Sequence, residues 1–189
     1  GSGPVVGTVS RLSRQKNPLD FVKMAALVKR QIPQAKFLFV GDGPLREETE
    51  ALIRECGLVR DVVLTGLRRD VPDLLRCMDI FTLTSLWEGL PRVIPQAMVA
   101  GLPVVAHNID GNAEIIQNGS NGFLIPPGDV VSMADRVVQL YKDQNLKKNI
   151  SEKGRATALQ EFSLPEMINK IAALYEELLL LKGVQIDAL

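Results

Sequence analysis

The sequence predicts a single α/β domain of the Rossmann-like kind, with a parallel sheet of about six strands and helices on both faces. Short, uninterrupted apolar runs alternate with stretches of helical spacing along the chain, and no repeat, low-complexity segment or linker interrupts them. Uninterrupted apolar strands are typical of a parallel sheet that is covered on both faces. The predicted strands are residues 4–9, 36–40, 62–65, 79–84, 103–106 and 122–125. We therefore expect one domain over residues 4–182.

The helices between these strands are predicted from their start and stop signals. Asn17 has the place of an N-cap, Pro18 lies in the first turn and Asp20 follows three residues after the cap. Ser163 and Glu166 have the spacing of a capping box before the last helix. Helices are predicted at residues 18–32, 45–56, 71–78, 91–100, 112–117, 130–142, 146–161 and 164–181.

Composition excludes several classes of protein. A chain of 189 residues, with 46% hydrophobic and 23% charged residues, has the balance of a folded domain. Lys plus Arg equals Asp plus Glu at 22 each, so the basic surplus of a nucleic-acid binder is missing. We see neither an apolar run of membrane-spanning length nor a signal-peptide pattern. Together with two distant cysteines, this predicts the cytoplasm as the compartment.

Smaller features are interpreted as structural. Cys56 and Cys77 are predicted to be small core residues rather than a disulfide or metal ligands. His107 is expected to be structural, Trp87 to pack its loop, and Glu114 to be a charge at a helix end. Residues 1–3 are interpreted as a tag remnant and residues 183–189 as a disordered tail.

The loop after the first strand is rich in cations. It contains the small residues Gly7 and Ser10, followed by Arg11, Arg14 and Lys16. In parallel α/β sheets, ligands bind beyond the carboxyl ends of the strands, where such loops leave the sheet. Guanidinium and ammonium groups there could neutralise an anionic ligand such as a diphosphate. A solvated basic turn is the alternative interpretation.

The loop after the second strand is glycine-rich, with Gly41 and Gly43 in the run GDGP. Glycines allow a tight turn or a close approach between the backbone and a ligand. The third glycine of a dinucleotide fingerprint is missing, which disfavours a nicotinamide-dependent dehydrogenase. Taken alone, the loop is best interpreted as a plain strand-to-helix turn.

The loop after the fourth strand is the most specific. Residues 85–91 (SLWEGLP) lead directly into a predicted helix, whose N-terminus favours a bound phosphate. Glu88 would repel a phosphate, so we expect it to accept hydrogen bonds from sugar hydroxyls; an N-terminal helix cap is the alternative. Gln96 lies eight residues further on, about two helical turns, so both side chains can face one cleft.

These motifs, in this order, resemble the large family of retaining nucleotide-sugar glycosyltransferases that includes glycogen synthases and sucrose synthases. The matching stretches cover nearly the whole chain. They are Ser10-Arg11-Leu12 with Lys16, Val40 to Pro44, Gly66, Ser85 to Ala106, and Gly111 to Asp129. Members of that family have two Rossmann-like domains that face a cleft, the GT-B architecture, and hold the donor mainly in the C-terminal domain. The resemblance implies that this chain is the C-terminal half of such an enzyme.

The resemblance also implies partners and roles for individual residues. Arg11 and Lys16 would hold the donor diphosphate and stabilise the leaving group, and Glu88 would contact the transferred sugar. The family uses cations and a helix dipole instead of a metal, and no Asp-x-Asp pair occurs here, so no metal or cofactor is expected. The partners would be a nucleoside diphosphate sugar, with UDP suggested by family frequency, and an N-terminal acceptor domain. The remaining donor contacts would be Gly7, Ser10, Gly41, Gly43, Leu67, Arg68, Ser85, Gly89, Leu90, Pro91 and Gln96.

One position departs from the family pattern. Gln96 stands where the family has a second glutamate, which commonly holds the ribose hydroxyls. An amide accepts with its oxygen and donates with its nitrogen, so we expect altered ribose contact rather than lost chemistry. The resemblance implies hexosyl transfer in polysaccharide or glycoconjugate synthesis, by a protein whose membrane contact would lie in its other half. The alternatives are a non-catalytic nucleotide-sugar-binding module and a nucleotide-sugar epimerase.

Overall fold

The computed structural model describes residues 3–182 and contains a six-stranded sheet in the order β3-β2-β1-β4-β5-β6. All neighbouring strands are parallel, so the predicted fold class is confirmed. The strand order reverses between β1 and β4, and this reversal is the point where doubly wound sheets open a crevice. The strands are β1 (Val5–Val9), β2 (Lys36–Val40), β3 (Val62–Leu64), β4 (Ile80–Leu83), β5 (Val104–His107) and β6 (Phe123–Ile125).

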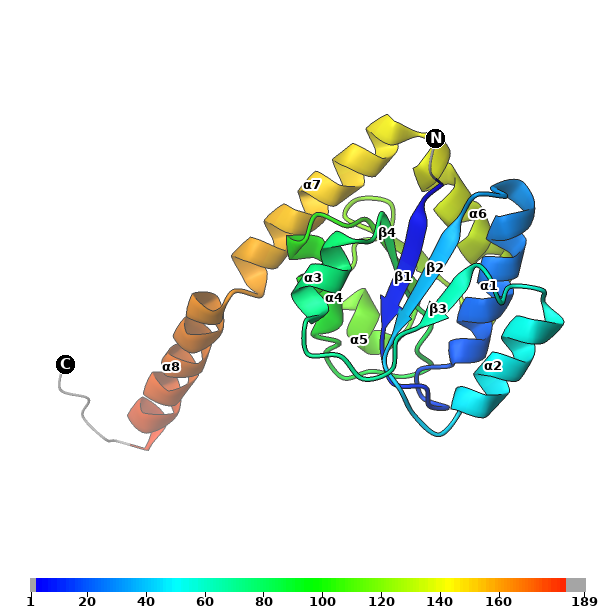
Figure 1. Ribbon diagram of the computed structural model, residues 1–189. Coiled ribbons are helices and arrows are strands. Elements are labelled where there is room, and N and C mark those ends of the chain that lie inside the picture. The colour runs from blue at the N-terminus through cyan, green and yellow to red at the C-terminus, as the bar shows by residue number, and fades with distance from the viewer. Residues whose placement is uncertain (1–2, 183–189) are drawn as a thin grey trace.

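Helices cover both faces of the sheet (Figure 1). One face carries α1, α2 and α6, whereas α3, α4 and α5 lie on the other, with α7 packed along α4. Their bounds are α1 (Pro18–Gln31), α2 (Arg46–Glu55), α3 (Val71–Arg76), α4 (Val93–Val99), α5 (Asp110–Ala113), α6 (Val130–Lys142), α7 (Gln144–Glu161) and α8 (Leu164–Leu181).

Aromatic packing anchors α1 to the sheet. Phe21 is fully buried, and its ring meets those of Phe37 and Phe39 edge-on, with centroids 6.4 Å and 5.4 Å away. Edge-to-face pairs add to the free energy gained by burial. On the opposite face, Phe81 packs with Ile94 and other buried side chains from α4. The loop that precedes α1 is therefore joined to a well-anchored helix.

Only α6 and α8 have their predicted bounds; the other six described helices differ by one to four residues at one end or both. α4 begins at Val93 rather than at residue 91, and Arg92 is its N-cap residue. α5 ends at Ala113, well before the predicted end at residue 117. There the buried side chain of Asn121 accepts a hydrogen bond from the Gln117 N–H at 2.8 Å, and it donates to a backbone carbonyl in the same turn. This side-chain bonding replaces the helical hydrogen bonds.

Three predictions about individual side chains need correction. Cys77 is exposed, because it caps the short helix α3, so its prediction as a core residue was wrong; Cys56 is only partly buried. Trp87 leaves 53% of its surface exposed and is therefore not the packed residue expected. Asn17 is the N-cap residue of α1, as predicted, but its side chain makes no capping hydrogen bond to the helix backbone. The predictions for residues 1–2 and 183–189 lie outside the described residues.

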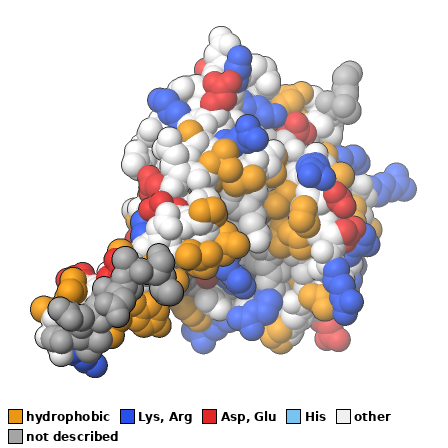
Figure 2. All heavy atoms as spheres, turned by 90° about the vertical axis from the view of Figure 1, so that its left-hand side faces the viewer, with side chains coloured by type: hydrophobic (Ala, Val, Ile, Leu, Met, Phe, Trp, Pro, Cys, Tyr) orange, Lys and Arg blue, Asp and Glu red, His pale blue; other side chains and the backbone are white. Residues whose placement is uncertain are grey.

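The last helix, α8, extends away from the domain (Figure 1). None of its residues is buried, and all of its leucines and isoleucines are exposed; Figure 2 shows hydrophobic side chains on this side of the molecule. The Ser163 hydroxyl accepts a hydrogen bond from the Glu166 N–H at 3.4 Å, half of the predicted capping box. Over residues 3–182, no helix is both long enough and apolar enough to cross a membrane.

Candidate functional site

The loops that follow β1 and β4 meet where the strand order reverses. The Leu86 N–H donates to the Gln15 carbonyl at 2.8 Å, and the Gln15 side-chain amide donates to the Trp87 carbonyl at 3.0 Å. Adjacent β1 and β4 bring their carboxyl ends together, so these contacts fix one loop against the other. The loop with the predicted cations is thereby held beside the loop with the predicted carboxylate.

An ion pair joins the two loops. Lys16 Nζ contacts Glu88 Oε1, and the Ser85 hydroxyl donates to the same carboxylate oxygen at 2.7 Å. The Lys16 and Glu88 side chains are only 16% and 8% exposed. Glu88 is therefore not a helix cap, the alternative that the sequence left open. It is one partner of a largely buried ion pair at the crevice between β1 and β4.

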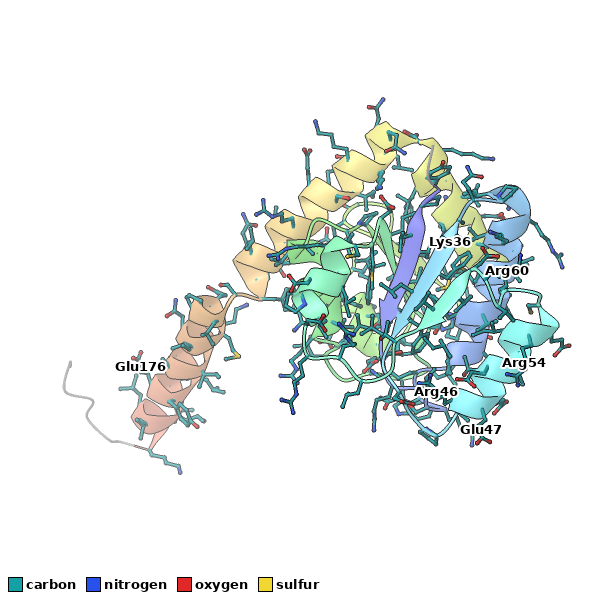
Figure 3. The ribbon with its side chains drawn as sticks, viewed as in Figure 1. Lys36, Arg46, Glu47, Arg54, Arg60 and Glu176 are labelled. Carbon is teal, nitrogen blue, oxygen red and sulfur yellow. The ribbon has the colours of Figure 1, made fainter. Side chains whose placement is uncertain are left out.

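The glycines after β2 are required by the close approach of two loops. Gly41 and Gly43 have φ of 140° and 159°, and an added Cβ would lie 1.9 Å from the Ser10 carbonyl oxygen and 2.5 Å from that of Leu12. Neither contact is sterically possible. These glycines pack the loop after β2 against the loop after β1, as the turn interpretation expects. Next to them, Arg46 pairs with Asp42 at 3.1 Å (Figure 3 labels Arg46).

A groove of about 1650 Å³ opens at this end of the sheet. Its walls include Arg11, Lys16 and Glu88, and Gln96 and Glu114 also line it. Of the other predicted contacts, the groove is lined by Ser10, Gly41, Leu67, Arg68, Leu90 and Pro91.

Four predicted contacts do not line the groove: Gly7, Gly43, Ser85 and Gly89. Gly7 is buried in β1, where an added Cβ would lie 2.2 Å from the sulfur of Met78, so its small size serves packing. Ser85 is fully buried, and its hydroxyl donates a hydrogen bond to the Glu88 carboxylate. The structure therefore gives Gly7 and Ser85 supporting positions rather than groove-lining ones.

The arginines of the groove differ in whether they already pair with a carboxylate. Arg68 makes two hydrogen bonds to the Asp70 carboxylate, at 2.8 Å and 2.5 Å, which raise the pKa of Arg68 and lower that of Asp70. Arg11 is exposed, and in the described part of the chain its side chain donates only to that of Gln15, at 3.2 Å. No carboxylate pairs with Arg11 among residues 3–182. Its guanidinium can therefore meet an anion without first breaking an ion pair.

The only histidine lies directly beneath the site. His107 is fully buried at the end of β5, with Nδ1 3.3 Å from the Ser85 carbonyl oxygen. Burial lowers its pKa below the usual range, against the opposing effect of Asp20, so the ring is neutral at pH 7. The buried Asn112 side chain donates to the His107 carbonyl at 2.8 Å. His107 thus links β5 to the loop after β4, the structural role expected of it.

Several groove residues were not predicted from sequence. Phe162, Met167 and Ile171 bring the end of α7 and the start of α8 to its edge, and Arg155 joins them. The spacing of apolar residues along a helix predicts which face is apolar, but it does not indicate which distant loop that face will lie against. Phe162, Met167 and Ile171 give this edge apolar surface, whereas Arg155 adds a further cation.

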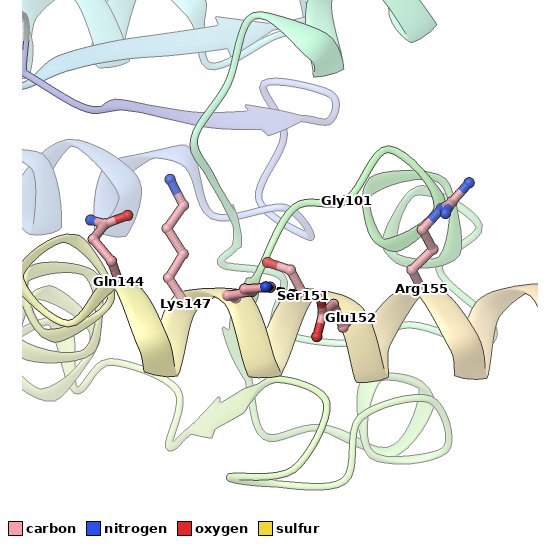
Figure 4. Close-up of a pocket in the computed structure, with 7 residues that line it drawn as sticks. Gly101, Gln144, Lys147, Ser151, Glu152 and Arg155 are labelled. Carbon is pink, nitrogen blue, oxygen red and sulfur yellow. Dashed lines mark ion pairs between the residues drawn. The ribbon is translucent and has the colours of Figure 1, made fainter.

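A second, smaller pocket lies along one side of α7 (Figure 4). It has a volume of about 360 Å³ and is lined by Gly101, Gln144, Lys147, Lys148, Ser151, Glu152 and Arg155. Lys147 already pairs with Asp79 at 3.2 Å. This pocket lies on the flank of a helix, away from the carboxyl ends of the strands. The groove is therefore the better candidate for the functional site.

Comparison with known proteins agrees with this fold. The family model described as glycosyl transferases group 1 matches residues 1–157. The chain is 35% identical over 178 residues to the UDP-Gal:alpha-D-GlcNAc-diphosphoundecaprenol alpha-1,3-galactosyltransferase of Escherichia coli, covering 92% of this chain and 46% of that enzyme. The chain therefore belongs to the glycosyl transferases group 1 family.

Solved structures match equally broadly. Anabaena HepE in complex with UDP and glucose superposes with a TM-score of 0.87 at 31% identity, covering 93% of this chain and 49% of that one. The C-terminal domain of a group 1 glycosyl transferase (LpcC) from Francisella tularensis shares the fold, with a TM-score of 0.80 at 22% identity over 86% of this chain and 88% of that one. The chain spans about half the length of the curated relatives it matches.

Proposed function

We propose that this chain is the donor-binding domain of a retaining, metal-independent glycosyltransferase. It would hold a nucleoside diphosphate sugar, with UDP as the nucleotide, for transfer to an acceptor on an N-terminal domain outside this sequence. The observation that carries the proposal is the groove at the strand-order reversal, which is lined by Arg11 and by the Lys16–Glu88 ion pair. HepE, which was solved with UDP and glucose, supports the choice of nucleotide.

The proposal assigns the charged groups to successive parts of the donor. Arg11 and Lys16 hold the diphosphate, and they stabilise the negative charge that grows on it as the bond to the sugar breaks. Fixed cations in a partly enclosed groove can do this without a metal ion. Glu88 then accepts hydrogen bonds from the hydroxyls of the transferred sugar. Because the acceptor must be held against the donor, this domain alone is inactive in transfer.

A calorimetric titration with UDP tests the proposal. The isolated chain is expected to bind UDP with the same affinity, within about twofold, in 1 mM EDTA and in excess magnesium, because the cations in the groove need no metal bridge. Cytidine and guanosine diphosphates in the same titration measure selectivity for the base. A strict requirement for magnesium, or the absence of binding by any of the three diphosphates, contradicts the proposal.

Gln96 provides a second, smaller prediction. If its amide contacts the ribose, Gln96→Glu is expected to leave UDP affinity unchanged or to tighten it by less than about tenfold, roughly one hydrogen bond. Gln96 is exposed on α4 and lines the groove, so the change should leave the fold intact. Calorimetry on both proteins measures the effect. Loss of UDP binding in the Gln96→Glu variant would contradict the placement of the ribose beside residue 96.

Gln96 also favours one alternative, a non-catalytic domain that binds nucleotide sugars without transferring them. The two possibilities differ in turnover rather than in nucleotide affinity. An assay of the full-length protein for sugar transfer or donor hydrolysis separates them. Turnover by the full-length protein supports the enzyme, and its loss in an Arg11→Ala variant would tie that turnover to this groove.

A further inference from the structure

The residue after Lys16 has an unusual backbone conformation. Asn17 has φ of 46° and ψ of 61°, and among residues 3–182 it is the only residue other than glycine with a positive φ. This left-handed conformation is unfavourable for L-residues, least so for asparagine and aspartate, and it persists where the surroundings enforce it. The Asn17 amide donates to the Asp20 carboxylate at 2.7 Å, and that carboxylate is buried.

A buried threonine holds the same turn from the other side. The Thr84 hydroxyl, at the end of β4, lies 3.0 Å from the Lys16 carbonyl oxygen and 2.9 Å from that of Asn17. Thr84 is only 3% exposed, so water does not compete for these contacts. The N–H groups of Lys16 and Asn17 both donate to the Ser13 carbonyl at 3.0 Å. The backbone of Lys16 is therefore fixed on both sides.

Two consecutive residues thus hold the two partners of the ion pair. Thr84 holds the backbone of Lys16, and Ser85 donates to the carboxylate of Glu88. Both directly follow the central strand β4 and are buried. The four-carbon stem of a lysine has a limited reach. The direction in which it leaves the backbone therefore decides which positions its ammonium group can reach.

We propose that Asn17 and Thr84 are positioning residues for Lys16. The left-handed turn at Asn17 and the Thr84 hydroxyl aim the Lys16 side chain across the crevice, where its ammonium group meets the diphosphate of a bound nucleotide. This rests on the proposed function, because it takes Lys16 to be a ligand of the diphosphate. Neither Asn17 nor Thr84 lines the groove, so they would act only through Lys16.

Paired substitutions test the proposal in the isolated chain. Thr84→Val removes the hydroxyl at nearly constant volume, and Thr84→Ser restores it. Asn17→Ala opposes the positive φ, and Asn17→Gly permits it. We expect Thr84→Val and Asn17→Ala to weaken UDP binding about five- to tenfold, and Thr84→Ser and Asn17→Gly to stay within about twofold of the unchanged protein.

The affinity for uridine, followed by NMR at millimolar concentrations, separates positioning from general damage. Uridine has no phosphate, so its affinity is expected to stay within about twofold in all four variants. Equal weakening of UDP and uridine, or unchanged UDP binding in both Thr84→Val and Asn17→Ala, overturns the proposal. If one of these two variants fails to fold, the comparison stands on the other.

A Lys16→Met variant distinguishes failure of this proposal from failure of the proposed function. If Lys16→Met weakens UDP binding while Thr84→Val and Asn17→Ala do not, only the positioning role is wrong. If Lys16→Met leaves UDP binding unchanged, the diphosphate does not meet Lys16, and both proposals fail at this residue. Weakening in all three variants, with the conservative changes tolerated, supports both.

Discussion

Replacing Arg11 with alanine is expected to weaken UDP binding by roughly 10- to 150-fold, the equivalent of about 1.5–3 kcal/mol for a charge-assisted hydrogen bond. Arg11 is exposed, and within residues 3–182 its one side-chain hydrogen bond goes to Gln15. The melting temperature should therefore change little. Calorimetric titration of both proteins with UDP measures the loss directly.

Arg14 provides a matched control for this change. It is an exposed arginine of the same loop, but it does not line the groove. Arg14→Ala removes the same net charge from the same region and is expected to change UDP affinity by less than about threefold, because exposed charges are screened by salt. Equal losses in the two variants would mean that only net charge matters, and no loss in Arg11→Ala would place the diphosphate elsewhere.

Replacing Phe21 with alanine is expected to lower the free energy of unfolding by about 3–5 kcal/mol. The side chain is fully buried and contacts the rings of Phe37 and Phe39, so its removal leaves a cavity between α1 and the sheet. Urea unfolding followed by circular dichroism measures the change. This is a large fraction of the stability of a typical domain, and it weakens the helix that the Lys16 loop enters.

Val63→Ala is the control for the Phe21 prediction. Val63 lies on the edge strand β3 and is 57% exposed, so its truncation is expected to cost less than about 0.5 kcal/mol. A loss below about 1 kcal/mol in Phe21→Ala would show that the core between α1 and the sheet does not have the packing described above.

The fold could be predicted because its signals are local. Each strand is a continuous apolar run, and each loop motif directly follows a strand. The order of these elements implies a parallel sheet, and a parallel sheet gathers its loops at one edge. The predicted cations and the predicted carboxylate are found at that edge, on neighbouring loops.

The remaining features depend on contacts between distant parts of the chain. Lys16 and Glu88 are 72 residues apart, and no pattern in the sequence indicates that they pair. The GDGP loop illustrates the same limit: its glycines do allow a close approach, but the backbone that approaches belongs to this chain, at Ser10 and Leu12. The left-handed turn at Asn17 was likewise unforeseen, because asparagine before a helix usually signals a side-chain cap.

Buried residues that support the groove-lining side chains are the hardest to find in a sequence. Thr84 and Ser85 directly follow an apolar strand, and no motif marks one as a partner of Lys16 and the other as a partner of Glu88. His107 attracts notice as the only histidine, yet its buried ring and lowered pKa suit a neutral structural link. The chemical type of a side chain indicates what it can do, whereas its surroundings decide what it does.

A crystal structure of this chain with bound UDP tests the central claim most directly. The proposal predicts the diphosphate within hydrogen-bonding distance of Arg11 and Lys16, at the carboxyl ends of β1 and β4, with the ribose near Gln96 and no metal ion between phosphate and protein. A diphosphate bound instead among Gln144, Lys147 and Lys148 on the flank of α7, or held only through a metal ion, would contradict it.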